Sequence, residues 1–178
     1  QKSGGRDYRH WAATNRVQAL ILLLPHLTEA RWSEVVARVF QMMKDDLIDY
    51  CGYNCYPVYR RTSDMQALAP YLTEDLLAAA EAVDTENALP GAIPDTLLPG
   101  MLETARDRKN VRWLFGIAPR LDDARLVAAA SAAGEIGGAA LQAEFVGKFA
   151  RELARIPAGE LYPAWCGTLR GMAALNRS

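Results

Sequence analysis

Length, composition and charge place this chain among globular proteins. It has 178 residues, 51% of them hydrophobic and 23% charged, which is enough to bury one core and too apolar for a disordered or fibrous chain. Its 20 basic and 21 acidic residues give a net charge of -1, so no overall field favours nucleic acid or an anionic membrane surface as a partner.

Two further features of composition bear on location and completeness. The apolar run over residues 17–24 is far shorter than the roughly 20 residues that span a bilayer, so we expect no membrane association. Three irregularly spaced cysteines, Cys51, Cys55 and Cys166, favour a reducing, cytoplasmic location. Because the first residue is Gln1 rather than Met, we expect a processed product or part of a larger multidomain chain.

Apolar residues recur at helical spacing along the chain, and no segment alternates with period two over the length of a strand. The apolar sets follow Thr28, Thr73, Asp95 and Asp122, residue types that suit the start of a helix. The sequence therefore predicts an all-α fold. The predicted buried faces consist of Trp32, Val35, Val36, Val39, Phe40, Met43 and Leu47; Leu76, Leu77, Ala80 and Val83; Leu97, Leu98, Met101, Leu102 and Ala105; Leu126, Val127, Ala130 and Ala133; Phe145, Val146, Phe149 and Leu153; and Leu161, Trp165, Leu169 and Met172.

Three helix starts share a sequence pattern. The stretches "LLLPHLTEARW", "QALAPYLTEDLL" and "FGIAPRLDDARL" each place Pro, one residue and Leu between an apolar stretch and a capping residue. We expect the proline to end one helix, the leucine to pack into the elbow, and the Thr or Asp to cap the next helix. The prolines are Pro25, Pro70 and Pro119, a recurrence of about 45 to 50 residues that is typical of helical repeats.

Residues 24–27, 68–72 and 117–121 carry a motif that resembles the "ALAPxL" of degenerate two-helix, HEAT-like repeats. Such repeats occur in sensor regions of bacterial signal-transduction NTPases and related multidomain proteins. The resemblance implies a single domain over residues 1–178, a short α-solenoid of about three to four stacked helix pairs, with units starting near residues 15, 60, 90, 110 and 140. Residues 1–10 are expected to form a flexible or irregular terminus. Because the chain has no phosphate-binding "GxxxxGK[ST]", an NTPase in this architecture would lie elsewhere.

The same resemblance suggests a function. Stacked helix pairs leave an extended surface that suits a peptide, a protein domain or a second copy of the chain. We therefore expect a non-enzymatic interaction module that needs no cofactor, acting as a sensor, adaptor or regulatory subunit in a bacterial signalling or defence system.

The segment "KDDLID" offers an alternative from another class. Asp45, Asp46 and Asp49 have a spacing similar to that with which prenyl-diphosphate enzymes hold magnesium, so a small magnesium-dependent enzyme acting on a diphosphate is the second hypothesis. Helical phase places Asp45 and Asp49 on the solvent side and Asp46 near the apolar face. Such a site also needs a second acidic cluster, and the densest one is "DTE" at residues 84–86.

The following "CGYNC" adds two thiols and several aromatic rings. Tyr50, Tyr53, Tyr56 and Tyr59 form a cluster whose composition is typical of protein-contact surfaces, and they are the candidate partner-binding residues, although packing onto neighbouring helices also explains them. For Cys51 and Cys55 we weigh buried free thiols against a redox pair. A zinc site would have to draw its ligands from distant positions, namely Cys51, Cys55, Cys166, His10 and His26.

Three other segments are expected to have structural roles. His26 occupies an elbow position held by other residue types in the other copies, so it is expected to be exposed and replaceable. The basic stretch at residues 106–112 reads as a solvated loop and not as a nucleic-acid contact. "GEIGG" at residues 134–138 follows no predicted strand, so it reads as a turn between helices and not as a phosphate-binding loop.

Overall fold

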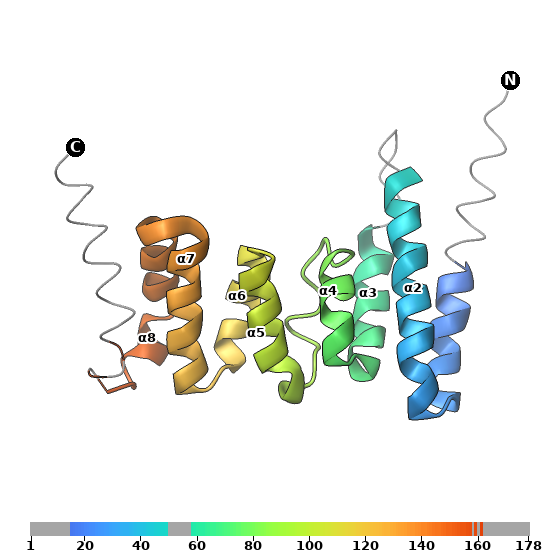
Figure 1. The fold of residues 1–178 in the computed structure, drawn as a ribbon, viewed down its shortest axis with the longest axis horizontal. Helices are drawn as coiled ribbons and strands as arrows, with labels where there is room; N and C mark the ends of the chain where they lie inside the picture. The colour runs from blue at the N-terminus through green and yellow to red at the C-terminus, as the bar shows by residue number, and fades with distance from the viewer. Residues whose placement is uncertain (1–14, 50–57, 158, 160, 162–178) are drawn as a thin grey trace, which may run out of the picture. The chain divides into compact units, whose positions relative to one another are not determined.

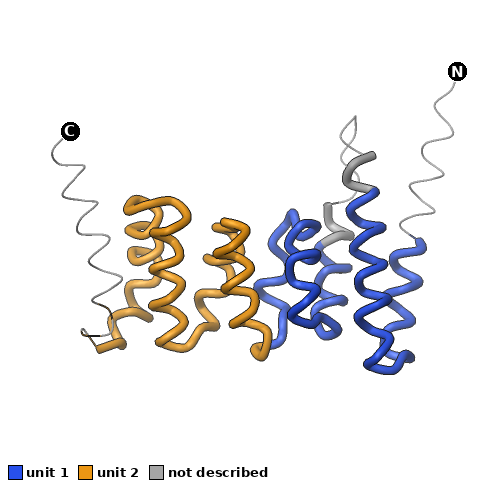
Figure 2. The backbone as a smooth tube through the Cα atoms, in the orientation of Figure 1, with its two compact units in different colours: residues 1–94 blue, residues 95–178 orange. Residues whose placement is uncertain are grey.

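The computed structural model describes residues 15–49, 58–157, 159 and 161. These residues form α-helices and short 3-10 helices, and no strand occurs among them, so the predicted all-α class is confirmed. Figure 2 shows the division of the chain into two compact units, residues 1–94 and 95–178.

Unit 1 consists of helices connected by short 3-10 turns. The chain runs through a helix over residues 15–23, η1 (Leu24–His26), α2 (Glu29–Asp49), α3 (Val58–Leu68), η2 (Ala69–Tyr71), η3 (Glu74–Leu76) and α4 (Leu77–Glu81) (Figure 1). Helix α2 contacts η2, η3 and α4.

Helix α2 has the one-sided character that its sequence predicts. Val36, Val39, Phe40 and Met43 are buried, whereas Gln41 is exposed, as expected when apolar residues recur at helical spacing. Burying such side chains contributes about 1.5–3 kcal/mol each, so this face holds α2 in the unit.

The three proline motifs adopt the same local conformation. Pro25, Pro70 and Pro119 lie within the 3-10 helices η1, η2 and η5 (Ala118–Arg120), each entered from a residue with helical backbone angles. The residue before each proline is buried, and the leucine after each turn is extended, with its N–H bonded to the first carbonyl of the turn. Of these leucines, Leu72 is buried and Leu27 and Leu121 are half-buried. The proline ends the preceding helix in all three cases, as predicted.

The expected caps differ between the elbows. The N–H of Arg125 donates to the Asp122 carboxylate at 2.9 Å, so Asp122 caps the next helix as predicted. Thr73 precedes η3 but makes no capping hydrogen bond, and its Oγ1 is buried without a partner. The cap predicted at Thr73 is therefore wrong.

Unit 2 contains η4 (Asp95–Leu97), α5 (Leu98–Asp107), α6 (Val111–Ile117), η5, α7 (Asp123–Lys148) and α8 (Ala150–Leu153) (Figure 1). Helix α5 begins with Pro99 in its first turn, so it starts late, as predicted. Helices α5, α6 and α7 contact one another, and α8 contacts α7. The largest fully buried side chains of this unit include Met101, Trp113, Leu114, Ile117 and Phe145.

Helix α7 is divided by a sharp turn at Gly138. This residue has φ 70° and ψ -165°, a combination that is almost restricted to glycine. Figure 1 shows the chain of α7 doubling back, so its two segments form a hairpin. The turn expected over residues 134–138 is therefore present, but it is confined to Gly138.

The hairpin explains a feature of the hydropathy of α7. Within the described residues, α7 is the one helix long and apolar enough to cross a membrane by length and composition alone. Gly138 interrupts it, and neither segment alone reaches the roughly 20 residues that a span requires. Much of its apolar character comes from small residues in the core, namely Ala129, Ala130, Ala132 and Ala133.

Candidate functional site

The tyrosine cluster predicted from the sequence lies largely outside the described residues. Tyr50, Tyr53 and Tyr56 fall outside the described residues. Tyr59 lies in α3, but its side chain is not described. Partner binding by these four residues stays a prediction.

The acidic motif is described only at its first residue. Asp45 is exposed and accepts a hydrogen bond from Nε2 of Gln41 at 2.7 Å, so its predicted place on the solvent side of α2 is confirmed. The side chains of Asp46 and Asp49 lie outside the described part of the structure. Whether Asp46 faces the core therefore stays a prediction.

In the second acidic cluster, residues 84–86, the buried Asp84 has a structural role. Asp84 is buried, and its two carboxylate oxygens accept hydrogen bonds from the backbone N–H groups of Ala88 at 2.8 Å and Leu89 at 3.2 Å. These bonds hold the loop after α4, in which Asn87 adopts a positive φ of 54°. Because Asp84 is buried and bonded to its own loop, its carboxylate is poorly placed to hold a metal ion against a substrate.

Of the cysteine and histidine residues considered as zinc ligands, only His26 lies within the described residues. Cys51, Cys55, Cys166 and His10 lie outside the described residues. His26 is exposed in η1, as predicted. Among the residues whose side chains the structure describes, no three His, Cys, Asp or Glu residues come together in a group that could hold a metal ion.

In the basic stretch at residues 106–112, one positive charge is paired with a carboxylate and another residue caps a helix. Arg106 forms a two-point ion pair with Glu135, with N–O distances of 2.6 and 3.0 Å. This hydrogen bond, with the negative charge of Glu135, raises the pKa of Arg106 above its usual value. Asn110 caps α6 by accepting a hydrogen bond from the N–H of Trp113 at 3.1 Å.

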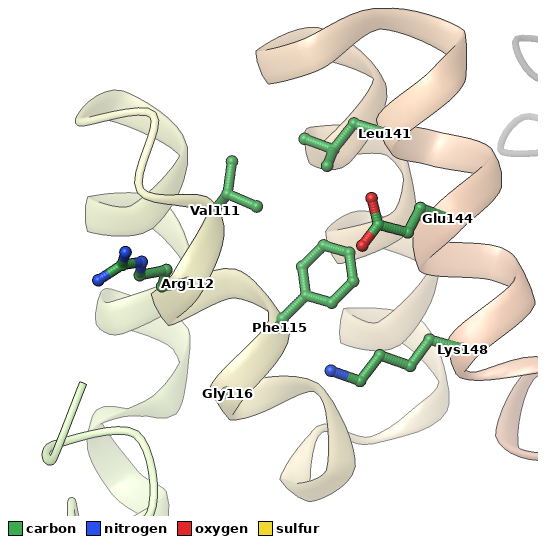
Figure 3. Close-up of a pocket in the computed structure, with 7 residues that line it drawn as sticks. All are labelled: Val111, Arg112, Phe115, Gly116, Leu141, Glu144 and Lys148. Atoms are coloured by element: carbon green, nitrogen blue, oxygen red, sulfur yellow. The ribbon is translucent and has the colours of Figure 1, made fainter. Parts of the chain in front are cut away.

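One open pocket lies between α6 and the second segment of α7 (Figure 3). Its volume is about 370 Å³, near the lower end of the range for small-ligand sites, and it suits one or two side chains of a bound segment. Seven residues line it: Val111, Arg112, Phe115, Gly116, Leu141, Glu144 and Lys148.

The local sequence explains why these residues meet. Trp113, Leu114 and Ile117 face the core from α6, so the other side of this short helix carries Val111 and Phe115 outward. On α7, the lining residues Leu141, Glu144 and Lys148 are three, four and seven apart and share one helical face. The turn at Gly138 brings that face back onto α6.

Phe115, the phenylalanine that lines the pocket, packs against two further phenylalanine rings. Phe115 is half-buried and meets the buried Phe145 edge-on, with ring centroids 5.1 Å apart. Phe149 lies 5.9 Å from Phe115 and 4.7 Å from Phe145. Such pairs add about 0.5–1.5 kcal/mol each beyond the burial of their area, so the exposed part of Phe115 is held firmly in place.

Charged groups surround the exposed ring of Phe115. The ammonium of Lys148 lies 5.0 Å from the centre of this ring and 5.7 Å from that of Phe149, within cation–π distance. Figure 3 shows the carboxylate of Glu144 and the ammonium of Lys148 on different sides of the Phe115 ring, with Arg112 pointing away from α7. No ion pair joins Arg112, Glu144 or Lys148 to another described residue.

The sequence contained only part of this site. It predicted Phe145 and Phe149 as core residues and marked Arg112 as the end of a basic stretch, but it gave no reason to join α6 to residues 141–148. One signal could have indicated the α7 side of the pocket. Leu141, Glu144 and Lys148 recur at helical spacing after the glycines of residues 134–138, next to the predicted buried face of Phe145 and Phe149.

No protein-family model, curated protein sequence or solved structure matches the chain. The resemblance to HEAT-like repeats therefore stays a prediction that depends on the proline motifs of this sequence.

Proposed function

We propose that this chain is a helical-repeat interaction module, a short α-solenoid that binds another protein, a peptide or a second copy of itself. The single observation that carries this proposal is the pocket between α6 and α7. It combines a rigid, half-exposed aromatic ring with charged groups at its edge, which is the arrangement in which hot spots of protein interfaces occur.

The repeat character of the proposal has separate support. The three Pro turns share their backbone conformation, and each places a buried residue before its proline, as expected of equivalent positions in successive units. On this view α6 and α7 belong to the later repeat units, and the pocket between them is part of the binding surface of the solenoid. The chain would then serve as a sensor, adaptor or regulatory subunit.

The proposal is tested by selecting binders from a displayed random-peptide library against the purified chain. Peptides should be enriched that bind the wild-type chain and bind the Phe115→Ala variant at least tenfold more weakly. The matched control is Leu22→Ala, which removes an exposed apolar side chain far from the pocket in sequence and should leave binding unchanged. Failure to enrich any peptide, together with a purely monomeric chain in sedimentation, would contradict the proposal.

The magnesium enzyme that was the alternative hypothesis has its own test. It requires that magnesium raise the melting temperature and that Asp46→Ala abolish turnover of a diphosphate substrate. Because Asp84 is buried and bonded to its own loop, we expect neither effect.

A further inference from the structure

We propose that the pocket between α6 and α7 recognises a partner segment in which an acidic side chain lies next to a large apolar one. This inference rests on the proposed function and adds the chemistry of the partner. The apolar side chain would pack on Phe115 and Leu141, and the carboxylate would pair with Lys148.

The position of Lys148 is the first step of the argument. Its ammonium lies at the edge of the pocket, 5.0 Å from the centre of the Phe115 ring. A carboxylate that hydrogen-bonds to this ammonium would therefore lie beside any group that packs on the ring. The two recognised groups must be neighbours in the partner, on one side chain or on adjacent ones.

The availability of the Lys148 charge is the second step. Glu144 precedes Lys148 by four residues, the order that favours an ion pair on a helix. Within the described residues no such pair forms, and Figure 3 shows the ring of Phe115 between the two charged groups. In this part of the chain the ammonium is paired with no carboxylate, so it can donate a hydrogen bond to one that a partner supplies.

The balance of charge is the third step. The pocket has two cations, Arg112 and Lys148, and one anion, Glu144. An acidic partner gains from this excess of positive charge, whereas a basic partner would meet Lys148 beside the Phe115 ring. A nucleic acid is disfavoured because a run of phosphates along this pocket would place negative charge beside Glu144 as well as beside Lys148.

Glu144 then has a role in specificity. It stands across the Phe115 ring from Lys148, so it would repel a second acid placed on that side. The pocket should therefore favour one carboxylate beside one apolar group over a uniformly acidic run.

The inference is tested with three capped peptides, acetyl-Phe-Glu-amide, acetyl-Phe-Gln-amide and acetyl-Phe-Lys-amide, titrated into the ¹⁵N-labelled chain. The glutamate peptide should bind about two- to fivefold more tightly than the glutamine peptide, and the lysine peptide most weakly. In Lys148→Met this preference should disappear, while Glu144→Gln should increase it. The amide signals of Phe115 and Gly116 should shift in each case.

Two controls separate this test from folding and from the broader proposal. Lys148 also complements the negative end of α7, so the melting temperature of Lys148→Met is measured beside binding. Equal binding of the three peptides at Phe115 would overturn the acidic preference and leave the interaction module standing. Shifts caused by a single-stranded oligonucleotide at the same amides would also overturn the acidic preference. Loss of all peptide binding at the pocket would overturn both proposals.

Discussion

The two long helices, α2 and α7, use their length in opposite ways. Helix α2 extends over 21 residues with one buried face, whereas α7 extends over 26 residues and is broken at Gly138 into a hairpin. The first contributes a single surface to its unit. The second turns back, so that its later segment meets α6 and closes one side of the pocket.

The comparison shows that a single glycine, Gly138, lets α7 fold back on itself and form a pocket with α6. A continuous α7 would carry Leu141, Glu144 and Lys148 away from Phe115, and the pocket would not form. In α2, by contrast, position in the helical period alone decides which side chains are buried. The following substitutions test this difference, from the largest expected effect to the smallest.

Phe40→Ala should have the largest effect on stability because the ring is almost fully buried on the single face of α2. Deleting a buried phenylalanine ring typically costs about 3–5 kcal/mol in free energy of unfolding. Urea denaturation followed by circular dichroism measures this loss. The neighbouring Gln41→Ala, on the exposed face, should change the free energy by less than about 0.5 kcal/mol; equal losses would refute a one-sided α2.

Gly138→Ala should destabilise the chain by about 1–3 kcal/mol, because alanine resists the backbone angles of this turn. Peptide binding at Phe115 should weaken in parallel as the hairpin opens. The control is Gly147→Ala in the same helix, where an added Cβ meets open space and should stabilise by about 0.5–1 kcal/mol. A neutral Gly138→Ala would show that α7 does not need its turn.

Asp122→Ala and Thr73→Val should act in opposite directions. Asp122 caps the start of α7, and losing this hydrogen bond should cost about 0.5–2 kcal/mol. The Thr73 hydroxyl is buried without a partner, so its replacement by a methyl group should be neutral or stabilising. Thermal unfolding of both variants checks the pair, and a destabilised Thr73→Val would mean that this hydroxyl has a partner after all.

Trp32→Phe should cost about 0.5–1.5 kcal/mol, the smallest loss among the substitutions expected to destabilise the chain appreciably. The indole N–H of Trp32 donates to the carbonyl oxygens of Leu24 at 3.1 Å and Leu27 at 3.2 Å, on either side of the Pro25 turn. Phenylalanine keeps a ring for the edge-on contact with Tyr71 but loses both bonds. Faster amide hydrogen exchange at Leu27, with α2 otherwise unchanged, would support this role. Unchanged exchange there would exclude it.

Local sequence predicted most features that depend on local physics. Helical spacing identified the buried residues of α2, and proline identified the turns because it has no backbone N–H to donate and so cannot continue a preceding helix. Prediction was less successful where the partner is distant in sequence. Thr73 looked like a cap as good as Asp122, and only the fold leaves its hydroxyl buried and unpaired.

The pocket was beyond prediction for the same reason. Phe145 and Phe149 could be assigned to a core, but the contact of Phe115 with them depends on how far the chain turns at Gly138. The sequence instead drew attention to Tyr50, Tyr53, Tyr56 and Tyr59, whose side chains lie outside the described part of the structure. Two candidate contact surfaces therefore remain, and binding experiments can choose between them.

The most direct test of the account is a nuclear Overhauser measurement on the chain bound to a library-selected peptide. If the pocket between α6 and α7 is the binding site, cross-peaks should connect the peptide to the ring of Phe115 and the methyl groups of Leu141. Cross-peaks confined to residues elsewhere, such as the exposed Leu22 and Leu23 or the tyrosines at positions 50, 53, 56 and 59, would contradict it.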